Sequence, residues 1–377
     1  MGEWKETILE KVAYYVNEKV KTDCLTEQNY ISTENMLPNL GGITKVTTIP
    51  DGKCTRYQSG DILVSNIRPY FKKLWKAQFE GGCSNDVLVI RSNGEIDADY
   101  LAYYLSSNNF FDYVMAGSNG TKMPRGNKGF TMTYPLVYPS DKKEQQRIAS
   151  IMSSYDELIE VNNRRIALLE ESARELYKEW FVRFRFPGYQ YAKFNKGLPE
   201  GWKEERLDKM ADIKVGGDKP ADFVLEPTNE KNIPIYSNGE SQKGLMGYTS
   251  HAKIKTNCIT VSARGNVGYV CLRRHAFTPI VRLLAVIPQK EIMDELYLYQ
   301  FLLNYEFFAT GAAQQQITAP MLKQMKVIRP EQSIRLDFYN KCDKIYLQIE
   351  SLEKQNAALA AARDRLLPRL ISGKIRV

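Results

Sequence analysis

Short apolar runs bounded by turn residues fill two parts of the chain, about residues 1–142 and 200–330. Runs such as DILVS, DVLVI, NCITVS and LLAVI are typical of buried strands, and Gly, Asn and Pro separate them. Each part also contains one longer apolar segment typical of a helix, YLAYYL near residue 100 and ELYLYQFLL near residue 295. We therefore predict an α+β fold with one small globular domain in each half of the chain.

A different period follows each globular part. Seam positions recur in steps of three and four from Ile159 to Trp180, and again from Phe338 to Leu366. Heptad seams of this kind need a partner helix to bury them, so we predict two long helices that pair with each other. The predicted pairing residues are Ile159, Ile166, Leu169, Leu176, Ile345, Ile349, Leu352 and Leu359. The alternative is that each helix packs only on its own domain.

Two asparagines, Asn162 and Asn356, fall within these seams. A polar residue at such a position can fix the register of a helix pair at some cost in stability. It can equally occupy a partly exposed point of the seam, and the sequence favours neither interpretation.

The two halves also share residues at a slowly changing offset. Trp4, Lys5 and Glu6 recur 198 positions later, the pair Tyr100-Leu101 recurs 197 positions later, and Glu144-Gln145 recurs 187 positions later. A colinear series of this kind indicates a duplication. It predicts a globular domain at 1–142, a helix at 143–186, a linker at 187–199, a second globular domain at 200–330 and a second helix that ends near Pro368 within 331–377.

Composition adds only weak constraints. The 377 residues carry a net charge of +8, from 52 Lys and Arg against 44 Asp and Glu. This mild basic excess fits a polyanionic partner, although many proteins without such a partner carry as much. The six cysteines form no CxxC pair, and no apolar run approaches the roughly 18 residues of a membrane span. We expect reduced thiols in a cytoplasmic protein without membrane contact.

Motifs for catalysis are missing from the sequence. The segment SNIRPYF at 65–71 lacks the spacing and the second proline of a methyltransferase NPPY motif, and no GxxxxGK[ST] phosphate loop occurs. Only two histidines are present, His251 and His275, and neither lies in a recognisable metal or triad spacing. We therefore predict no catalytic residue, no metal site and no bound cofactor. An enzyme with an unrecognised site is a remaining alternative.

Polar and basic loops are the best candidates for a binding function. Lys and Arg can contact DNA phosphates, whereas Asn, Gln, Arg, Ser and Thr can read base edges. The candidate DNA contacts are Arg68, Ser118, Asn119, Lys122, Arg125, Asn127, Lys128, Asn238, Lys243, Arg264, Asn266, Arg273, Arg274, Gln314 and Gln315. Ordinary solvated loops would have a similar composition, so this alternative stays open. The loops differ between the halves while the scaffold repeats, which is expected if one scaffold presents two recognition surfaces.

Three segments resemble a known family, the specificity subunits of Type I restriction–modification enzymes. They are LPEGWKEERLDKMADI at the start of the second domain, EQQRIASIM with DELIE at the start of the first helix, and LLPRLISGKIRV at the end of the chain. The resemblance extends to the order of domain, helix, domain and helix. The N-terminus MGEWKETILE departs from the family pattern because it lacks the leading proline.

This resemblance implies a non-catalytic subunit that binds double-stranded DNA. Each globular domain would be a target-recognition domain for one half of a bipartite, asymmetric sequence, and the helices would pair antiparallel as a spacer. The implied partners are two methyltransferase (modification) subunits, which use S-adenosylmethionine at adenine, and up to two ATP-dependent restriction (motor–nuclease) subunits. The chain itself would bind no small cofactor. The main competing interpretation is a coiled-coil scaffold or protein-interaction module without DNA specificity.

Overall fold

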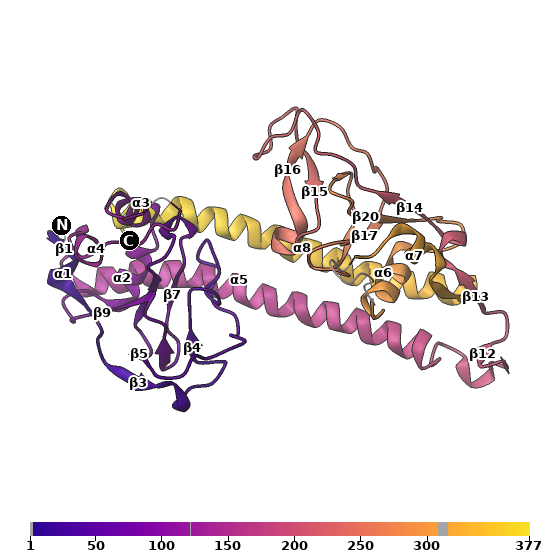
Figure 1. Cartoon of the computed structure of the whole chain (residues 1–377), viewed down its shortest axis with the longest axis horizontal. Coiled ribbons are helices and arrows are strands. Elements are labelled where there is room, and N and C mark those ends of the chain that lie inside the picture. Colours follow the sequence, from indigo (N-terminus) through magenta and orange to yellow (C-terminus); the bar gives the residue numbers. More distant parts are fainter. Residues whose placement is uncertain (1–2, 121, 308–315) are drawn as a thin grey trace. The chain divides into compact units, whose positions relative to one another are not determined.

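The computed structural model describes residues 3–120, 122–307 and 316–377 (Figure 1). The chain divides into two compact units. Unit 1 comprises Met1–Asn162 with Lys354–Val377, and unit 2 comprises Asn163–Glu353. Each unit thus combines one globular domain with part of both long helices.

Unit 1 is built on two four-stranded sheets and one two-stranded sheet. The central sheet has the order β2 (Ala13–Tyr15), β9 (Val87–Ser92), β6 (Ile62–Ser65) and β7 (Leu74–Lys76). The second has the order β3 (Lys19–Lys21), β5 (Lys53–Tyr57), β8 (Gly81–Cys83) and β4 (Tyr30–Ile31). The two-stranded sheet pairs β1 (Trp4–Ile8) with β10 (Pro135–Pro139). The short helices are α1 (Leu9–Val12), α2 (Ala98–Leu105), α3 (Asn108–Ala116) and α4 (Lys128–Met132).

Unit 2 repeats this plan. Its central sheet has the equivalent order of β14 (Ala211–Val215), β20 (Leu284–Pro288), β17 (Cys258–Val261) and β18 (Val270–Arg273). β13 (Lys203–Arg206) pairs with β21 (Lys326–Arg329) as β1 pairs with β10, and the helices α6 (Glu295–Leu303) and α7 (Ala319–Gln324) correspond to α2 and α4. The remaining sheet differs, with the order β16 (Leu245–Thr249), β15 (Ile233–Tyr236) and β19 (Thr278–Pro279). The predicted tandem α+β architecture is confirmed.

The two long helices pack antiparallel in each unit. They are α5 (Lys142–Tyr177), which a π-helical turn extends over Lys178–Val182, and α8 (Gln332–Ile371). In unit 1 the side-chain amide of Asn162 donates to Asn356 Oδ1 at 2.9 Å. In unit 2 the rings of Trp180 and Phe338 lie 6.0 Å apart. The residue numbers in each of these two contacts add to 518.

Burial along α5 and α8 differs in detail from a strict heptad. Ile349 and Leu352 are buried, Ile159 and Leu359 are half-buried, and Ile166, Leu169, Leu176 and Ile345 are partly buried against the core of unit 2. The neighbouring Tyr177 and Tyr346 are more deeply buried than Leu176 and Ile345. The reason is that the second globular domain covers them: Tyr177 packs on Tyr297, and Tyr346 packs on Tyr299.

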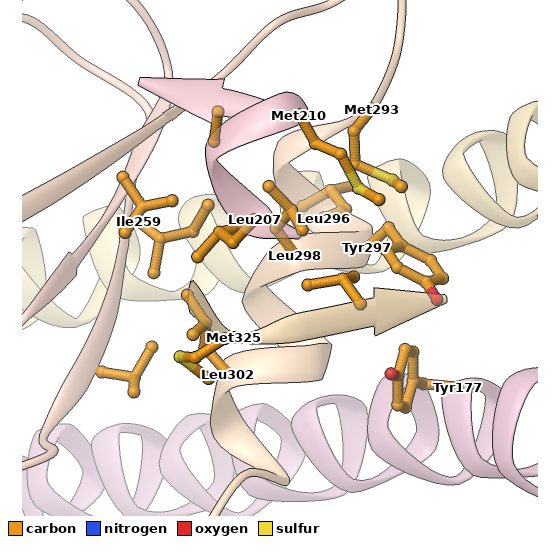
Figure 2. Close-up of a cluster of buried hydrophobic side chains, with 14 of the residues drawn as sticks. Tyr177, Leu207, Met210, Ile259, Met293, Leu296, Tyr297, Leu298, Leu302 and Met325 are labelled. Atoms are coloured by element: carbon orange, nitrogen blue, oxygen red, sulfur yellow. The ribbon is translucent and has the colours of Figure 1, made fainter. Parts of the chain in front are cut away.

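The core of unit 2 joins the globular domain to α5. Figure 2 shows Tyr177 of α5 and Tyr297 of α6 among Leu207, Met210, Met293, Leu296, Leu298, Leu302 and Met325. Because full burial of one such apolar side chain contributes about 1.5–3 kcal/mol, this cluster strongly favours a fixed domain–helix contact within the unit.

The chain ends of unit 1 also meet. α8 does not end near Pro368, as the sequence suggests, but continues to Ile371, because Leu367, Leu370 and Ile371 are buried in the core with Leu9. Gly373 then adopts a φ of +70°, and a Cβ at this position would lie 2.9 Å from the ring of Trp4. In unit 2 the linker makes the equivalent contact, with Phe186 packed on Trp202. A hairpin of β11 (Phe194–Asn195) and β12 (Leu198–Pro199) completes this linker.

Candidate nucleic-acid interface

Two loops that are distant in sequence meet at one end of the central sheet in unit 1. The backbone N–H of Gly126 donates to the Asn66 carbonyl at 3.0 Å, and the N–H of Arg68 donates to the Pro124 carbonyl at 2.8 Å. We call residues 66–72 and 119–126, without residue 121, the first loop pair. The contact brings the predicted Arg68 and Arg125 onto one surface.

The 119–126 segment is a tight hairpin. Asn119 and Arg125 exchange two backbone hydrogen bonds of 2.9 Å, and Gly120 takes the positive φ of +92° that the turn requires. Lys122 and Met123 therefore lie exposed at the tip. The Arg125 guanidinium lies 3.3 Å from Asp86, and both side chains are exposed, so Arg125 can exchange this partner for a phosphate.

The other loop of this pair is held in an uncommon backbone conformation. Arg68 and Lys72 have φ values of +49° and +50°, which cost roughly 1–3 kcal/mol each for residues other than glycine. Hydrogen bonds hold the turn on both sides: one is the Arg68–Pro124 bond, and another runs from the Leu40 N–H to the Lys72 carbonyl at 2.9 Å. This turn presents Tyr70, which is 46% exposed.

Positive charge is concentrated behind this turn. Burial lowers the pKa of Lys73, and the nearby Arg68 guanidinium lowers it further. The Lys73 ammonium donates to the Thr33 carbonyl at 2.6 Å, so Lys73 supports the loop from inside. Arg68, Lys72, Lys122 and Arg125 then give the first loop pair its basic character.

The remaining predicted residues of this region divide into structural and exposed groups. Ser118 Oγ donates to the Met115 carbonyl at 2.8 Å, and Asn127 caps α4 by accepting from the Phe130 N–H at 3.1 Å. These two side chains therefore shape the loop. Lys128 is exposed at the start of α4.

Unit 2 repeats the same loop contact with different residues. The N–H of Ile317 donates to the Ala263 carbonyl at 3.0 Å, and Ala263 follows Ser262 just as Asn66 follows the equivalent Ser65. We call residues 263–268 and 316–317 the second loop pair. Its main charged group is Arg264, whose Nε and Nη2 atoms donate to Gln316 Oε1 at 3.3 and 3.1 Å. Asn266 is exposed on the same loop.

Asn238 supports the second loop pair from below. Its Oδ1 accepts from the Ala263 N–H at 2.8 Å, and its Nδ2 donates to the Val281 carbonyl at 2.6 Å. The amide is thus engaged on both sides, which identifies Asn238 as a loop-positioning residue.

Three predicted basic residues of unit 2 have partners within the protein. Arg273 is only 3% exposed, donates to Thr260 Oγ1 at 3.1 Å and lies 3.7 Å over the Tyr236 ring. Arg274 lies 2.5 Å from Asp343 on α8, and Lys243 lies 2.5 Å from Glu353 on the same helix. The contacts of Arg273 and Arg274 stabilise the domain, so the interface proposed below includes neither. The side chains of Lys243 and Glu353 are both exposed, so Lys243 can exchange this partner as Arg125 can, but it lies outside the second loop pair.

Other sequence-predicted features have simpler outcomes. Gln314 and Gln315 lie outside the described residues. Within the part of the chain that the structure describes, no group of three or more His, Cys, Asp or Glu side chains is placed to hold a metal ion. No described helix is both long and apolar enough to cross a membrane. Tyr70 and Lys72 also lie on the first loop pair but were not among the predicted contacts, because their only signal in the sequence is an aromatic residue among basic residues.

Comparisons with known proteins agree with this plan. The family model described as type I restriction modification DNA specificity domain matches residues 3–171 and again residues 199–359. The chain is 25% identical to the MjaIX type I restriction enzyme specificity subunit of Methanocaldococcus jannaschii, over 77% of this chain and 71% of that protein. It is 23% identical to the HindI specificity subunit of Haemophilus influenzae, over the full length of both.

The fold is also similar to that of solved structures. The type I restriction-modification system S subunit from M. genitalium matches 98% of this chain and 96% of its own, with a TM-score of 0.57 and 16% identity. At this level of identity the likeness concerns the fold alone. Two copies of one domain type, each continued by a long helix, are therefore common to both chains.

Proposed function

The chain belongs to the family of type I restriction modification DNA specificity domains, and from this premise we propose that it reads a bipartite DNA target, one half through each loop pair. The observation that carries the proposal is the shared backbone contact at the end of the central sheet. Gly126 donates to Asn66 in unit 1, and Ile317 donates to Ala263 in unit 2. One scaffold thus presents two loop pairs that differ in chemistry.

The chemistry of the two loop pairs suits two different half-sites. The first is basic and carries an exposed aromatic side chain, which favours phosphate contacts combined with apolar base contact. The second has one arginine among amide-bearing and small residues, which favours hydrogen bonding to base edges. An asymmetric target is the expected result, because the two halves are read by unlike side chains.

Catalysis belongs to the partner subunits in this account. DNA, methyltransferase subunits and restriction subunits are the partners of a type I specificity subunit. We propose that two methyltransferase subunits bind, one for each repeat, and that up to two restriction subunits join them. These partners would use S-adenosylmethionine and ATP, and this chain would bind no small cofactor. Because the substrate is genomic DNA, we place the assembly in the cytoplasm.

A reconstitution experiment tests whether methyl transfer depends on the modification subunit. The purified chain is incubated with DNA and labelled S-adenosylmethionine, with and without its modification subunit. Methyl transfer should appear only when the modification subunit is present. Turnover by a homogeneous preparation of the chain alone would contradict the proposal.

A further inference from the structure

Resting on the proposed function, we infer that Arg264 reads one guanine of the half-site bound by unit 2, and that Gln316 positions it for this contact. The reasoning begins with the guanidinium. Its Nε and Nη2 atoms share one acceptor, Gln316 Oε1, at 3.3 and 3.1 Å. One edge of the planar fork is therefore held by the protein.

The described residues leave the outer end of the Arg264 fork without a partner. Among the described residues, no other hydrogen bond or ion pair engages this guanidinium. Its end therefore presents one N–H of Nη1 and the second N–H of Nη2 as two parallel donors. Two parallel donors match the O6 and N7 acceptors of guanine in the major groove, and arginine to guanine is the commonest specific base contact.

The backbone beneath Arg264 is also fixed. The preceding residue, Ala263, is bonded on both sides, through its N–H to Asn238 Oδ1 at 2.8 Å and through its carbonyl to the Ile317 N–H at 3.0 Å. The following Gly265 takes a φ of +70°, which turns the chain away sharply. Arg264 is thus ordered before DNA binds, which reduces the entropy lost in a bidentate contact.

The composition of the second loop pair favours a base contact over a phosphate contact. An arginine fork can bind either a phosphate or a guanine bidentately, but surfaces that follow the phosphate backbone do so through several Lys and Arg side chains. A bidentate base contact needs the plane of the fork to be set, and the Gln316 carbonyl oxygen sets it. Residues 263–268 and 316–317 contain no Lys or Arg other than Arg264, so a single arginine carries the proposed recognition of guanine by this loop pair.

Equilibrium binding of the chain, assembled with its modification subunit, tests the inference. Each guanine in the half-site assigned to unit 2 is replaced in turn, and the affinities of the wild type, Arg264→Lys, Gln316→Ala and Gln316→Glu are compared. The wild type should lose about 5- to 150-fold in affinity at one guanine, the range expected for a good bidentate pair. Arg264→Lys should abolish most of this discrimination while changing affinity for unrelated DNA by less than about threefold, because the charge is kept.

The Gln316 variants separate positioning from simple folding. Gln316→Ala should lower the discrimination at the same guanine, and Gln316→Glu should restore it because the acceptor oxygen is kept. The control is Lys290→Ala, which removes an exposed positive charge just after β20. It should leave the ratio of affinities for the original and the guanine-replaced DNA unchanged. Full discrimination by Arg264→Lys, or a half-site without any guanine contact, would overturn the inference and leave the proposed function standing. A wild-type assembly without sequence preference would instead contradict the proposed function itself.

Discussion

Arginine residues have two distinct tasks within the same domain of unit 2. Arg264 lies half-exposed on a loop and offers one edge of its guanidinium to a ligand. Arg273 lies under the Tyr236 ring, and Arg274 lies between Asp343 and Glu350 of α8. The difference depends on neighbours that are distant in sequence and not on residue type.

The task assigned to Arg274 predicts a stability effect. Arg274→Ala leaves the half-buried Asp343 and Glu350 without their shared cation, so the free energy of unfolding should fall by about 1 kcal/mol. Urea unfolding followed by tryptophan fluorescence measures this. Lys290→Ala is the matched control and should have little effect. If Arg274→Ala left the stability unchanged and weakened DNA binding, Arg274 would be a DNA contact, as the sequence predicts.

The first loop pair, together with the adjacent Lys128, predicts a salt dependence. Replacing Lys122, Arg125 and Lys128 by Ala should flatten the slope of log affinity against log salt concentration by up to about 2.7, because each lost phosphate contact contributes about 0.9. The control replaces Lys5, Lys11 and Lys143, three exposed lysines of unit 1 outside the loop pair, by Ala. Equal slopes for the wild type and the loop variant would remove this hairpin from the interface.

Sequence reasoning identified loop chemistry better than side-chain partners. The Gly-rich basic segment around Lys122 is polar except at Met123 and Pro124, so the exposure of its charged residues could be predicted locally. Arg273 and Arg274 resemble a basic loop in sequence, but Tyr236 and Asp343 cover them from other elements. The sequence likewise predicts Asn238 as a DNA contact, whereas in the structure its side chain holds Ala263.

At the scale of elements, the helix pair was the most predictable feature, because a heptad seam repeats locally over many turns. Asn162 and Asn356 share a hydrogen bond across the helix pair, with Asn162 buried and Asn356 half-buried, and their role in fixing the register stays a prediction. The deeper burial of Tyr177 and Tyr346, compared with Leu176 and Ile345, could not be predicted. It arises from domain contacts that the helix sequence alone does not contain.

The asparagine pair predicts a pattern of non-additive effects. Asn162→Leu removes one hydrogen-bond partner of Asn356 and should lower the free energy of unfolding by about 1–2 kcal/mol. Changing both residues to Leu should recover this loss or exceed it, because two apolar residues then fill the seam. Urea unfolding of the single and double variants checks the pattern, with the exposed Gln355→Leu as control. Additive losses in the double variant would contradict it.

The helices also provide a test of the predicted spacer. The chain passes between the two units only through α5 and α8. Inserting seven residues between Asn163 and Arg164, and seven between Lys354 and Gln355, adds one heptad at facing positions and keeps the seam. Each helix lengthens by about 10.5 Å, equivalent to about three base pairs.

The expected result of the double insertion is a longer unspecified gap with both half-site sequences unchanged. Mapping of methylated adenines in cells that contain the modification subunit measures the gap. A two-residue insertion at the same points is the control, because it rotates the seam by about 200° and should impair pairing. A variant that still methylates at the original spacing would show that the helices do not set it.

At the scale of the whole molecule, duplication explains why the two halves of the chain share the same elements in the same order. The equivalent strand order in the two central sheets and the shared backbone contact at the loop pairs follow from one ancestral plan. The loops and the third sheet differ, and these are the parts that sequence comparison between the halves could not predict. A scaffold that repeats while its loops diverge is expected when each copy reads a different sequence.

The central claim, that each unit reads its own half of the target, is tested most directly by a domain exchange. Residues 1–142 are replaced by the corresponding domain of a related specificity subunit, and methylated adenines are mapped in cells expressing the modification subunit with either chain. The account predicts that one half of the methylated motif changes while the other half stays the same, because base readout is local to each loop pair. A change in both halves, or in neither, would contradict it.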